Sequence, residues 1–320
     1  MDLASTYLSY LRYAQADDRG FHNFLSFQKS WRDEPTQGDS FGRALWSLGY
    51  TLKSAPYEGM RLSAKWLFDS SMNSLSRLTD LRAKSFSIIG LVYYLEGLKN
   101  FSDSDQRKVN KEEITQKIKL LADTIVRSYQ KNRDDRPPRV GELASRRSGR
   151  QRVEAGWRWF ENYLTYENAR LPQSLLFAYK VIKDKSYLKM AQESLDFLIE
   201  VQYIKEKEYF SFIGQDGWYP KGGKKAQFDQ QPVEAGSLVE VLCLMYETTR
   251  EKKYLEFAQI AFEWFYGRNI AAKPLWDQET TGVKDGIIRS GVNLNQGGES
   301  LVSFLLAYLA LKETLERKSD

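Results

Sequence analysis

The sequence is poor in the side chains that many enzymes and metal sites require. Its 320 residues include one histidine, His22, and one cysteine, Cys243. One cysteine cannot form an intramolecular disulfide, and one residue of each type cannot complete the ligand set of a zinc site. A single histidine also excludes proton transfer by paired histidines, and no motif around His22 supports a Ser-His-Asp triad. We therefore expect no metal and no other cofactor.

Long apolar runs, signal-peptide features and nucleotide-binding loops are missing as well. No stretch approaches the roughly 20 apolar residues that span a bilayer. The N-terminus, MDLASTYLSYLRYAQADD, lacks a basic start, an apolar run and a small-residue cleavage site. The paired glycines of PKGGKK follow a proline and lack the spacing of a phosphate-binding loop. These absences predict a cytoplasmic protein with no membrane span.

The net charge of +5 comes from one segment of the chain. Residues 131–152 hold eight basic and three acidic side chains, so the rest of the chain is neutral. Because no basic stripe is interleaved with aromatic residues, we expect no nucleic-acid partner. A polar segment with prolines is typical of a mobile loop, and the alternative is a flap over a bound ligand.

What the sequence does contain is a repeat with a spacing of 67 residues. Each copy reads as a helix, a short polar turn and a second helix that opens with Tyr-Leu, which predicts αα-hairpins. A third copy of the first helix begins at Gln296. The spacing is shared by the pairs Glu167–Glu234, Tyr179–Tyr246, Tyr187–Tyr254, Ala191–Ala258 and Phe197–Trp264.

The length and the repeat predict one all-α domain over residues 1–320, an (α/α)6 toroid of helical hairpins. Long ordered segments without helical period are uncommon in compact domains unless they build a binding site. We expect a loop or short β-hairpin at 210–227 and a second loop at 274–298. Helices are expected at 2–15, 39–54, 58–75, 79–97 and 111–131, in the hairpins 166–203 and 230–267, and at 296–316.

The segment FDQQPVEAGSLVE, residues 228–240, is the strongest candidate for a functional site. Asp229 lies in a loop, Pro232 suits the first turn of a helix, and Glu234 follows in the same turn. The positive end of the helix dipole favours an ionised glutamate there. The alternative is an ordinary capped helix start, since glutamates are common in first turns.

In a toroid of hairpins the first helices run parallel inside the ring, so their N-termini open on one face. Carboxylates, amides, arginines and aromatic rings at such an opening suit a neutral polyhydroxylated ligand. The alternative is that the aromatic residues belong to the core. The expected substrate-binding residues are Arg43, Trp159, Glu167, Arg170, Gln173, Trp218, Tyr219, Gln230, Gln231, Asp285, Asn293, Asn295, Gln296 and Glu299.

Several motifs resemble a bacterial six-hairpin, glycosidase-like domain family. They are FHNF, GRALWSLG, WFENYLTYENARLPQSLL, GWYPKGGKKAQFDQQPVEA, WFYGRN, DGI and VNLNQGGES, from about residue 20 to 315. Members often form the C-terminal part of proteins that begin with a sugar-nucleotide glycosyltransferase, and also occur alone. The resemblance implies an (α/α)6 toroid related to glycoside-processing enzymes, with a glycosyltransferase as a partner.

The chain departs from this family at three places. Phe41 and Gly236 stand where histidine is usual, and Val283-Lys284 stands where a Gly-Cys pair is usual. If those histidines act in catalysis, this member is altered or inactive.

Carboxylate chemistry remains after these exclusions, so we expect a glycoside hydrolase that acts on an oligosaccharide or glycoconjugate. One carboxylic acid protonates the leaving oxygen, and a second carboxylate activates water or attacks the sugar. We expect Glu234 as the acid and Asp39 as the base, with Asp229 the main rival for either role. Analogy with many toroidal glycosidases favours an inverting enzyme.

Two alternatives stay open. A non-catalytic carbohydrate-binding or scaffold domain that partners a glycosyltransferase would need the aromatic residues and amides but no acid with a raised pKa. A glycoside phosphorylase would use the arginines of residues 131–152 as its phosphate ligands.

Overall fold

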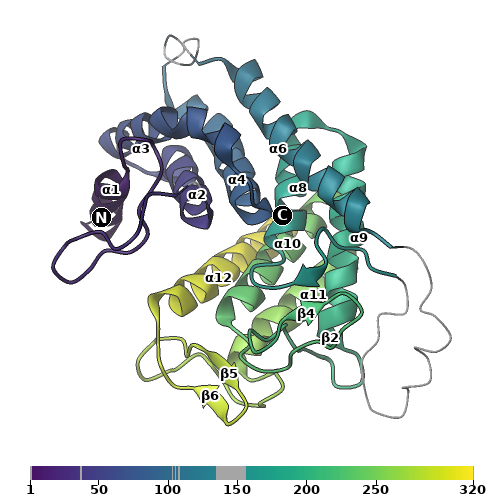
Figure 1. Ribbon diagram of the computed structural model, residues 1–320. Helices are drawn as coiled ribbons and strands as arrows, with labels where there is room; N and C mark the ends of the chain where they lie inside the picture. Colours follow the sequence, from purple (N-terminus) through teal and green to yellow (C-terminus); the bar gives the residue numbers. More distant parts are fainter. Residues whose placement is uncertain are drawn as a thin grey trace. The chain divides into compact units, whose positions relative to one another are not determined.

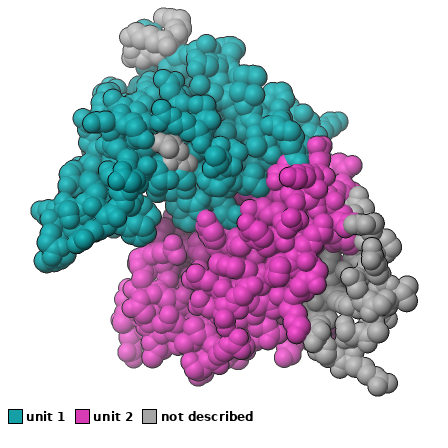
Figure 2. Space-filling model, viewed as in Figure 1, with its two compact units in different colours: residues 1–127, 174–188 teal, residues 128–173, 189–320 magenta. Residues whose placement is uncertain are grey.

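The computed structural model describes residues 2–36, 38–102, 104, 106, 109–134 and 156–319. The expected basic loop at 131–152 lies outside the described residues from 135 onward. The chain divides into two compact units (Figure 2). Unit 1 comprises Met1–Arg127 and Ser174–Leu188, and unit 2 comprises Ser128–Gln173 and Lys189–Asp320. The single domain expected from the sequence stays a prediction.

Ten α-helices have their bounds within the described residues. Figure 1 labels them. Helices α6, α8 and α9 have residues in both units. Unit 1 also contains α1 (Asp2–Ala14), α2 (Asp39–Ser54), α3 (Glu58–Ser71), α4 (Leu81–Gly97) and the 3-10 helices η1 (Met72–Arg77) and η2 (Leu98–Asn100). The shared helices are α6 (Lys111–Asn132), α8 (Arg170–Ile182) and α9 (Lys185–Gln202).

Unit 2 also contains α10 (Pro232–Thr249), α11 (Lys252–Glu263), η4 (Trp264–Tyr266) and α12 (Gly298–Ser319). Three antiparallel strand pairs connect its loops: β1 (Tyr163–Leu164) with β4 (Tyr219–Pro220), β2 (Tyr203–Ile204) with β3 (Tyr209–Phe210), and β5 (Gly286–Ile288) with β6 (Gly291–Asn293). The register pairs Leu164 with Tyr219, Tyr203 with Phe210, and Ile287 with Val292.

Helix α4 of unit 1 and helix α10 of unit 2 are each enclosed on nearly all sides. In unit 1, every residue of α4 from Arg82 to Val92 is buried. In unit 2, the residues of α10 from Pro232 to Val239 are all buried, and α10 packs against α11 and α12. A helix that is buried all round is a core helix, whereas a surface helix buries one stripe. Helix α11 shows such a stripe, at Tyr254, Leu255, Ala258 and Ala261.

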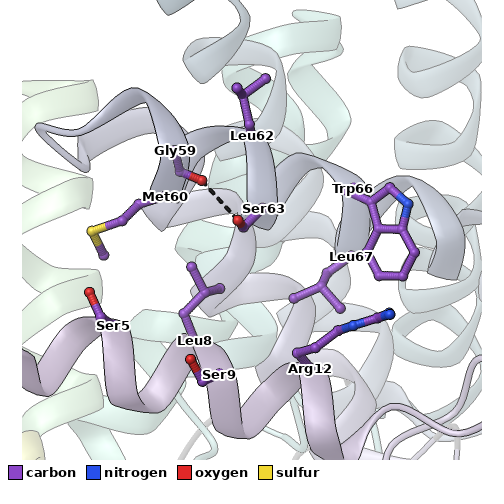
Figure 3. A pocket seen from close by; sticks show the side chains of 10 residues that line it. All are labelled: Ser5, Leu8, Ser9, Arg12, Gly59, Met60, Leu62, Ser63, Trp66 and Leu67. Carbon is purple, nitrogen blue, oxygen red and sulfur yellow. Dashed lines mark hydrogen bonds between the residues drawn. The ribbon is translucent and has the colours of Figure 1, made fainter.

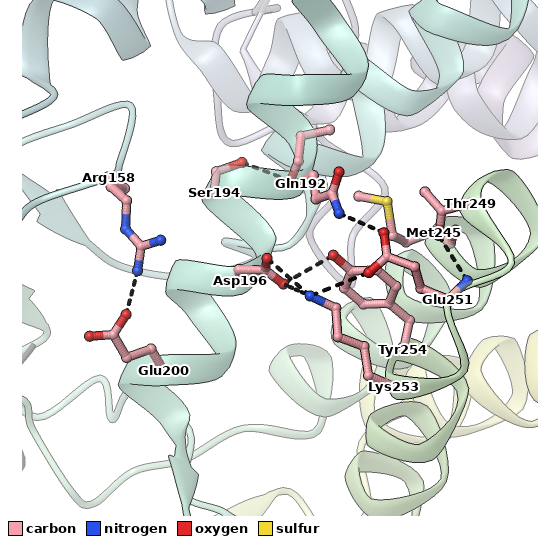
Figure 4. A network of polar contacts seen from close by, with 11 residues as sticks. Arg158, Gln192, Ser194, Asp196, Glu200, Met245, Thr249, Glu251, Lys253 and Tyr254 are labelled. Atoms are coloured by element: carbon pink, nitrogen blue, oxygen red, sulfur yellow. Dashed lines mark hydrogen bonds and ion pairs between the residues drawn. The ribbon is translucent and has the colours of Figure 1, made fainter. Parts of the chain in front are cut away.

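Polar side chains link α9 to α11 and to the residue before it in unit 2 (Figure 4). Asp196 Oδ1 accepts from Tyr254 Oη at 3.0 Å and lies 3.1 Å from Lys253 Nζ. Gln192 Nε2 donates to Glu251 Oε1 at 2.8 Å. Exposed pairs of this kind contribute about 1 kcal/mol or less each, so they align the helices more than they stabilise them.

The helix starts and ends differ from the expected ones where a local contact decides them. Helix α4 begins at Leu81 because the Asp80 side chain accepts a hydrogen bond from Ala83 N at 2.6 Å. Helix α3 ends at Ser71, and the expected end at 75 lies in a 3-10 turn. Helix α8 begins at Arg170, with Pro172 in its first turn, so the expected start near 166 is wrong.

The two segments expected as loops carry short strands. Segment 210–227 contains the end of β3 and all of β4, but these strands pair with β2 and β1 and not with each other. Segment 274–298 contains the β5–β6 hairpin. Among the described residues, none of the helices combines the length and apolarity needed to cross a membrane.

Candidate functional site

A buried cluster of charged side chains surrounds Arg170 in unit 2. Arg170 Nε lies 3.2 Å from Glu167 Oε1, and its Nη2 lies 2.8 Å from Glu240 Oε1. Its Nη1 donates to Gln173 Oε1 at 2.8 Å. Burial alone would lower the pKa of Arg170, but the carboxylates of Glu240 and Glu167 raise it above its usual range. Of the expected sugar-binding residues, Glu167, Arg170 and Gln173 are therefore brought together, bonded to one another.

Glu234 lies beside this cluster in the first turn of α10 and is only 4% exposed. Its Oε1 accepts a short hydrogen bond from Glu167 N, and its Oε2 accepts one from Asn168 Nδ2 at 3.1 Å. Donors thus occupy both carboxylate oxygens, at a helix N-terminus whose dipole favours negative charge. Asn168 was not singled out from the sequence, although Asn is a typical turn residue. Its side chain also accepts from Thr165 N at 3.0 Å.

Asp229 lies five residues before Glu234 and has a different environment. Asp229 is half-buried. Among the described residues, no hydrogen bond or ion pair joins its carboxylate to another group. Its φ is +61°, and Trp218 and Glu167 have φ values of +53° and +44°. Such left-handed conformations cost a non-glycine residue on the order of 1–3 kcal/mol, and they cluster at ligand sites. Three expected site residues in unit 2 therefore hold strained backbone.

The two glutamines before α10 have separate roles. Gln230 is fully buried, and its Oε1 accepts from Phe212 N at 2.8 Å. Both of its amide protons are used, because Nε2 donates to Gln227 O at 2.7 Å and to Ser211 Oγ at 3.2 Å. Gln231 is more exposed, and its Nε2 donates to Gln215 Oε1 at 2.8 Å. Gln230 thus fixes the loop, while Gln231 stays near the surface.

Asp285 forms the cap of α12. Its Oδ1 accepts from Gly297 N at 2.7 Å and from Ser300 Oγ at 2.5 Å, and its Oδ2 bonds Asn295 Nδ2. Burial by itself would raise the pKa of Asp285, but the hydrogen bonds from Ser300, Gly297 and Asn295 together lower it. Asp285 thus accepts the backbone N–H directly before α12 and one side chain of its first turn, which fixes the start of the helix.

The remaining polar residues near this cap are more exposed. Asn293 Oδ1 accepts from Asn295 N at 3.2 Å, and Gln296 Oε1 accepts from Thr280 Oγ1 at 2.9 Å. Glu299 lies in the first turn of α12 and is exposed. The structure therefore brings these residues to one end of α12, where most of their bonds are made within the loop itself.

The aromatic residues divide into core and surface. Trp159 has no exposed surface, and Tyr219 is 9% exposed. A sugar cannot stack on a ring that has no exposed face, which favours the core alternative for Trp159. Trp218 is half-buried and lies 6.3 Å from the ring of Tyr166, which is 36% exposed. Tyr166 is thus an accessible aromatic residue that the sequence reading did not single out.

In unit 1, Asp39 is hydrogen bonded to a second carboxyl group, Asp80. Burial is the largest cause that raises the pKa of Asp80, and the charge and hydrogen bond of Asp39 raise it further, against the bond from Ala83 N. A like group beside a carboxyl group disfavours its ionisation, which is the direction found for Asp80. Arg43 lies in the same unit, with its guanidinium 4.9 Å from the centre of the Phe86 ring. Asp80 precedes a helix in the pattern of an N-cap, which is the signal that would have found it.

The positions at which this chain departs from the resembled family are packed. Phe41 and Val283 are fully buried, and the Phe41 ring lies 6.0 Å from that of Phe21. A Cβ atom at Gly236 would lie 2.6 Å from the carbonyl oxygen of Ser303, so no side chain fits between α10 and α12. Phe41, Gly236 and Val283 therefore serve packing and cannot transfer protons, while Lys284 is half-buried with its Nζ 3.7 Å from Asp277 Oδ2.

A groove in unit 1 lies away from these residues, between α1 and α3 (Figure 3). It encloses about 670 Å³ and is lined by apolar residues, three serines and Arg12, whose guanidinium lies 4.0 Å from the centre of the Trp66 ring. None of the expected site residues lines it. Among the described residues, no group of three or more His, Cys, Asp or Glu side chains is arranged to hold a metal ion.

No protein-family model matches the chain, and no curated protein matches its sequence. Solved structures do match. D-mannose isomerase superposes on 96% of this chain and 78% of its own, with a TM-score of 0.63 and 13% identity. A family 76 glycoside hydrolase (mannosidase) from Bacteroides thetaiotaomicron covers 99% of this chain and 84% of its own, with a TM-score of 0.57 and 14% identity.

Cellobiose 2-epimerase from Bacillus thermoamylovorans matches 98% of this chain and 86% of its own, with a TM-score of 0.58 and 12% identity. The chain has the (α/α)6 six-hairpin glycosidase-like fold. This confirms the fold class expected from the hairpin repeat. At identities this low, the likeness establishes the fold and leaves the chemistry to the residues of this chain.

Proposed function

We propose that this chain is a carbohydrate-active protein, and specifically a glycoside hydrolase that acts on an oligosaccharide or glycoconjugate. The observation that carries the proposal is the pair of acidic residues at the start of α10. Glu234 is buried and held by two donors, while Asp229 presents a carboxylate without a described partner on strained backbone. The three similar structures reported above, a D-mannose isomerase, a family 76 glycoside hydrolase (mannosidase) and a cellobiose 2-epimerase, support the same class.

The hydrogen bonds favour an assignment of roles opposite to the one expected from the sequence. Glu234 is suited to the base, which must be ionised to activate water. We assign Asp229, in the same unit, as the proton donor, and Asp39 of unit 1 stays the sequence prediction against which it is tested. Substitution of each aspartate in turn identifies the donor.

Sugar binding is assigned to the exposed groups near Asp229. The half-buried Trp218 and the exposed Tyr166 offer ring faces on which the C–H groups of a sugar stack. Gln231 and Asn293 offer amide groups near the surface. Glu167, Arg170 and Gln173 are committed to one another, so we assign them to holding the site rather than to contacting the ligand.

One observation favours a second function, a carbohydrate-binding domain without catalysis. Both oxygens of Glu234 are occupied by donors, and a residue so held can be a structural link between Asn168 and α10. Such a domain would bind through Trp218 and Gln231 and would need no acid. A glycosyltransferase partner, implied by the sequence resemblance, belongs to this second proposal.

Incubation of the protein with a panel of α- and β-linked oligosaccharides, followed by product analysis, separates the two functions. A hydrolase releases shorter sugars, and Glu234→Gln lowers kcat by about 100-fold to 10,000-fold. Asp229→Asn or Asp39→Asn does the same, depending on which is the donor. Glu256→Gln, on the exposed side of α11, is the control and keeps full activity.

The hydrolase assignment fails if Glu234→Gln and both aspartate variants cleave as fast as the unsubstituted protein. Saturable binding without any product selects the binding domain. Absence of both binding and cleavage over the whole panel rejects the carbohydrate proposal.

A further inference from the structure

Lys225 occupies an unusual position in the loop that leads to α10. Its Nζ donates to two backbone carbonyl groups, Val201 O at 2.9 Å and Ser211 O at 2.8 Å. Val201 lies in the last turn of α9, and Ser211 directly follows β3. One side chain therefore joins three segments that are distant in the sequence.

The amine of Lys225 is held without a counter-ion. No carboxylate of the described residues lies within ion-pair distance of it. The acidic groups on the neighbouring elements have other partners, because Glu200 of α9 pairs with Arg158 and Glu208 beside β3 lies 3.7 Å from Arg268. Burial lowers the pKa of Lys225 to about 7. The residue is half-buried by surface area, but its nitrogen faces carbonyl groups and not an acid.

The contacts of Lys225 continue directly to the candidate site. Ser211, whose carbonyl group Lys225 binds, accepts at its Oγ from Gln230 Nε2. Gln230 N also pairs with Ile287 O at 3.1 Å, which ties the same residue to β5. Asp229 and Gln231 flank Gln230, so the conformation of Asp229 at φ +61° depends on these bonds.

We propose that Lys225 is a positioning residue, whose two hydrogen bonds fix segment 225–231 and so hold Asp229, Gln230 and Gln231 for the ligand. The role of Lys225 in ligand binding rests on the proposed function. The hydrogen bonds that Lys225 forms do not depend on that function. Lys225 does not contact the reacting atoms in this scheme. It acts through Ser211 and Gln230.

The position of the amine makes the segment sensitive to pH. When the segment opens, Lys225 is hydrated and its pKa returns toward about 10.4. Between about pH 7 and pH 10 the open form then binds one proton more than the closed form. Lowering the pH therefore favours opening, by about tenfold per pH unit in this window, and the effect levels off below pH 7.

Hydrogen exchange of the backbone amides of residues 211–231 tests the proposal, with protection factors corrected for intrinsic exchange. The unsubstituted protein is expected to lose protection about tenfold per unit as the pH falls from 10 to 7. Lys225→Met, which has a side chain of similar length, exchanges at least tenfold faster at pH 9 and shows no such slope. Lys224→Met, at the exposed neighbouring lysine, is the matched control and behaves as the unsubstituted protein.

Equal protection and equal slopes in the two methionine variants would overturn the proposal. If Lys225→Met does not fold, the slope of the unsubstituted protein and the titration of the Lys225 side chain by ¹³C NMR decide it. A lysine that titrates near pH 10 contradicts the proposal. Hydrogen exchange is measured without a sugar. The test of Lys225 can therefore be interpreted even if the hydrolase proposal fails.

Discussion

The two units solve the burial of acidic groups in different ways. In unit 2, Arg170 lies between Glu167 and Glu240 and compensates their charge. In unit 1, Asp39 and Asp80 bring two like groups together, and the pKa of Asp80 is raised by burial and by Asp39. The acidic groups around Arg170 are therefore compensated by a cation, whereas Asp80 has a like group as its neighbour.

The difference matters for function because a compensated cluster and a pair of like groups suit different tasks. Arg170 and its partners give a rigid support for Glu234, which accepts a bond from Glu167 N. In the Asp39–Asp80 pair, burial and the neighbouring Asp39 favour the protonated form of Asp80. Each kind of carboxylate environment is one that acid–base chemistry uses, and substitutions can weaken or sharpen the contrast.

The largest effect is expected from Arg170→Met. Removal of the guanidinium leaves two buried carboxylates without compensation, which costs about 3–5 kcal/mol of unfolding free energy. Urea denaturation at pH 7 measures it. Arg289→Met is the control, since Arg289 forms an exposed pair with Asp216 at 2.8 Å and its loss costs about 1 kcal/mol or less. Equal losses in the two variants would contradict the role of Arg170.

A smaller effect is expected from Glu234→Gln on stability. The new amide group directs N–H donors toward Glu167 N or Asn168 Nδ2, so one buried donor loses its acceptor at a cost of about 1–3 kcal/mol. Thermal and urea unfolding measure it, with Glu256→Gln as the exposed control. An unchanged unfolding free energy would show that Glu234 does not link these segments.

Asp80→Asn tests the aspartate pair through pH. The pKa of Asp80 is raised in the folded protein, so the folded state binds its proton more tightly than the unfolded state does. Stability is then lost as the pH rises through the folded pKa. Asparagine can still accept from Ala83 N and needs no proton, so the variant loses less stability between pH 4 and pH 8 than the unsubstituted protein.

Asp80→Ala separates this pH effect from the helix cap. It removes the ionisable group, as Asp80→Asn does, and also the bond to Ala83 N, so its unfolding free energy lies about 1 kcal/mol below that of Asp80→Asn at every pH. If Asp80→Asn and the unsubstituted protein show parallel stability curves over this range, the pKa of Asp80 is not raised in the folded protein.

The smallest effect is expected at the cap of α12. Ser300→Ala removes one of the three described donors to Asp285, at a cost of about 0.5–1.5 kcal/mol near neutral pH. Because these bonds lower the pKa of Asp285, their contribution is lost as the pH falls through the folded pKa. The difference between the variant and the unsubstituted protein should therefore shrink in acid, as urea denaturation at pH 3 and pH 7 would show.

The helices were predictable because their apolar spacing is long and regular. The bodies of α2, α10 and α11 agree with the expected ranges, and the 67-residue repeat identified the hairpins. Glu167 and Glu234 show where the repeat is insufficient. They occupy equivalent positions in the sequence, yet Glu234 lies inside α10 while Glu167 precedes α8 with a left-handed backbone. Pro172 in the first turn of α8 marks the difference in sequence.

The partners of the site residues were not predictable, because they come from other segments. The bonds of Gln230 to Phe212 and Ser211, and of Arg170 to Glu240, join positions that no local pattern connects. The burial of Trp159 follows from packing of the whole unit and not from its neighbours in sequence. Sequence reading therefore found the elements that carry the site, while the structure decided which side chains remain available.

A crystal of this protein soaked with a mixed pool of oligosaccharides tests the central claim most directly. The account predicts sugar density that stacks on Trp218 and contacts the Asp229 carboxylate near the start of α10. The crystal must leave Asp229 and Trp218 free of contacts to neighbouring molecules. Sugar bound elsewhere on the molecule, with no sugar at these two residues, would contradict the proposed site.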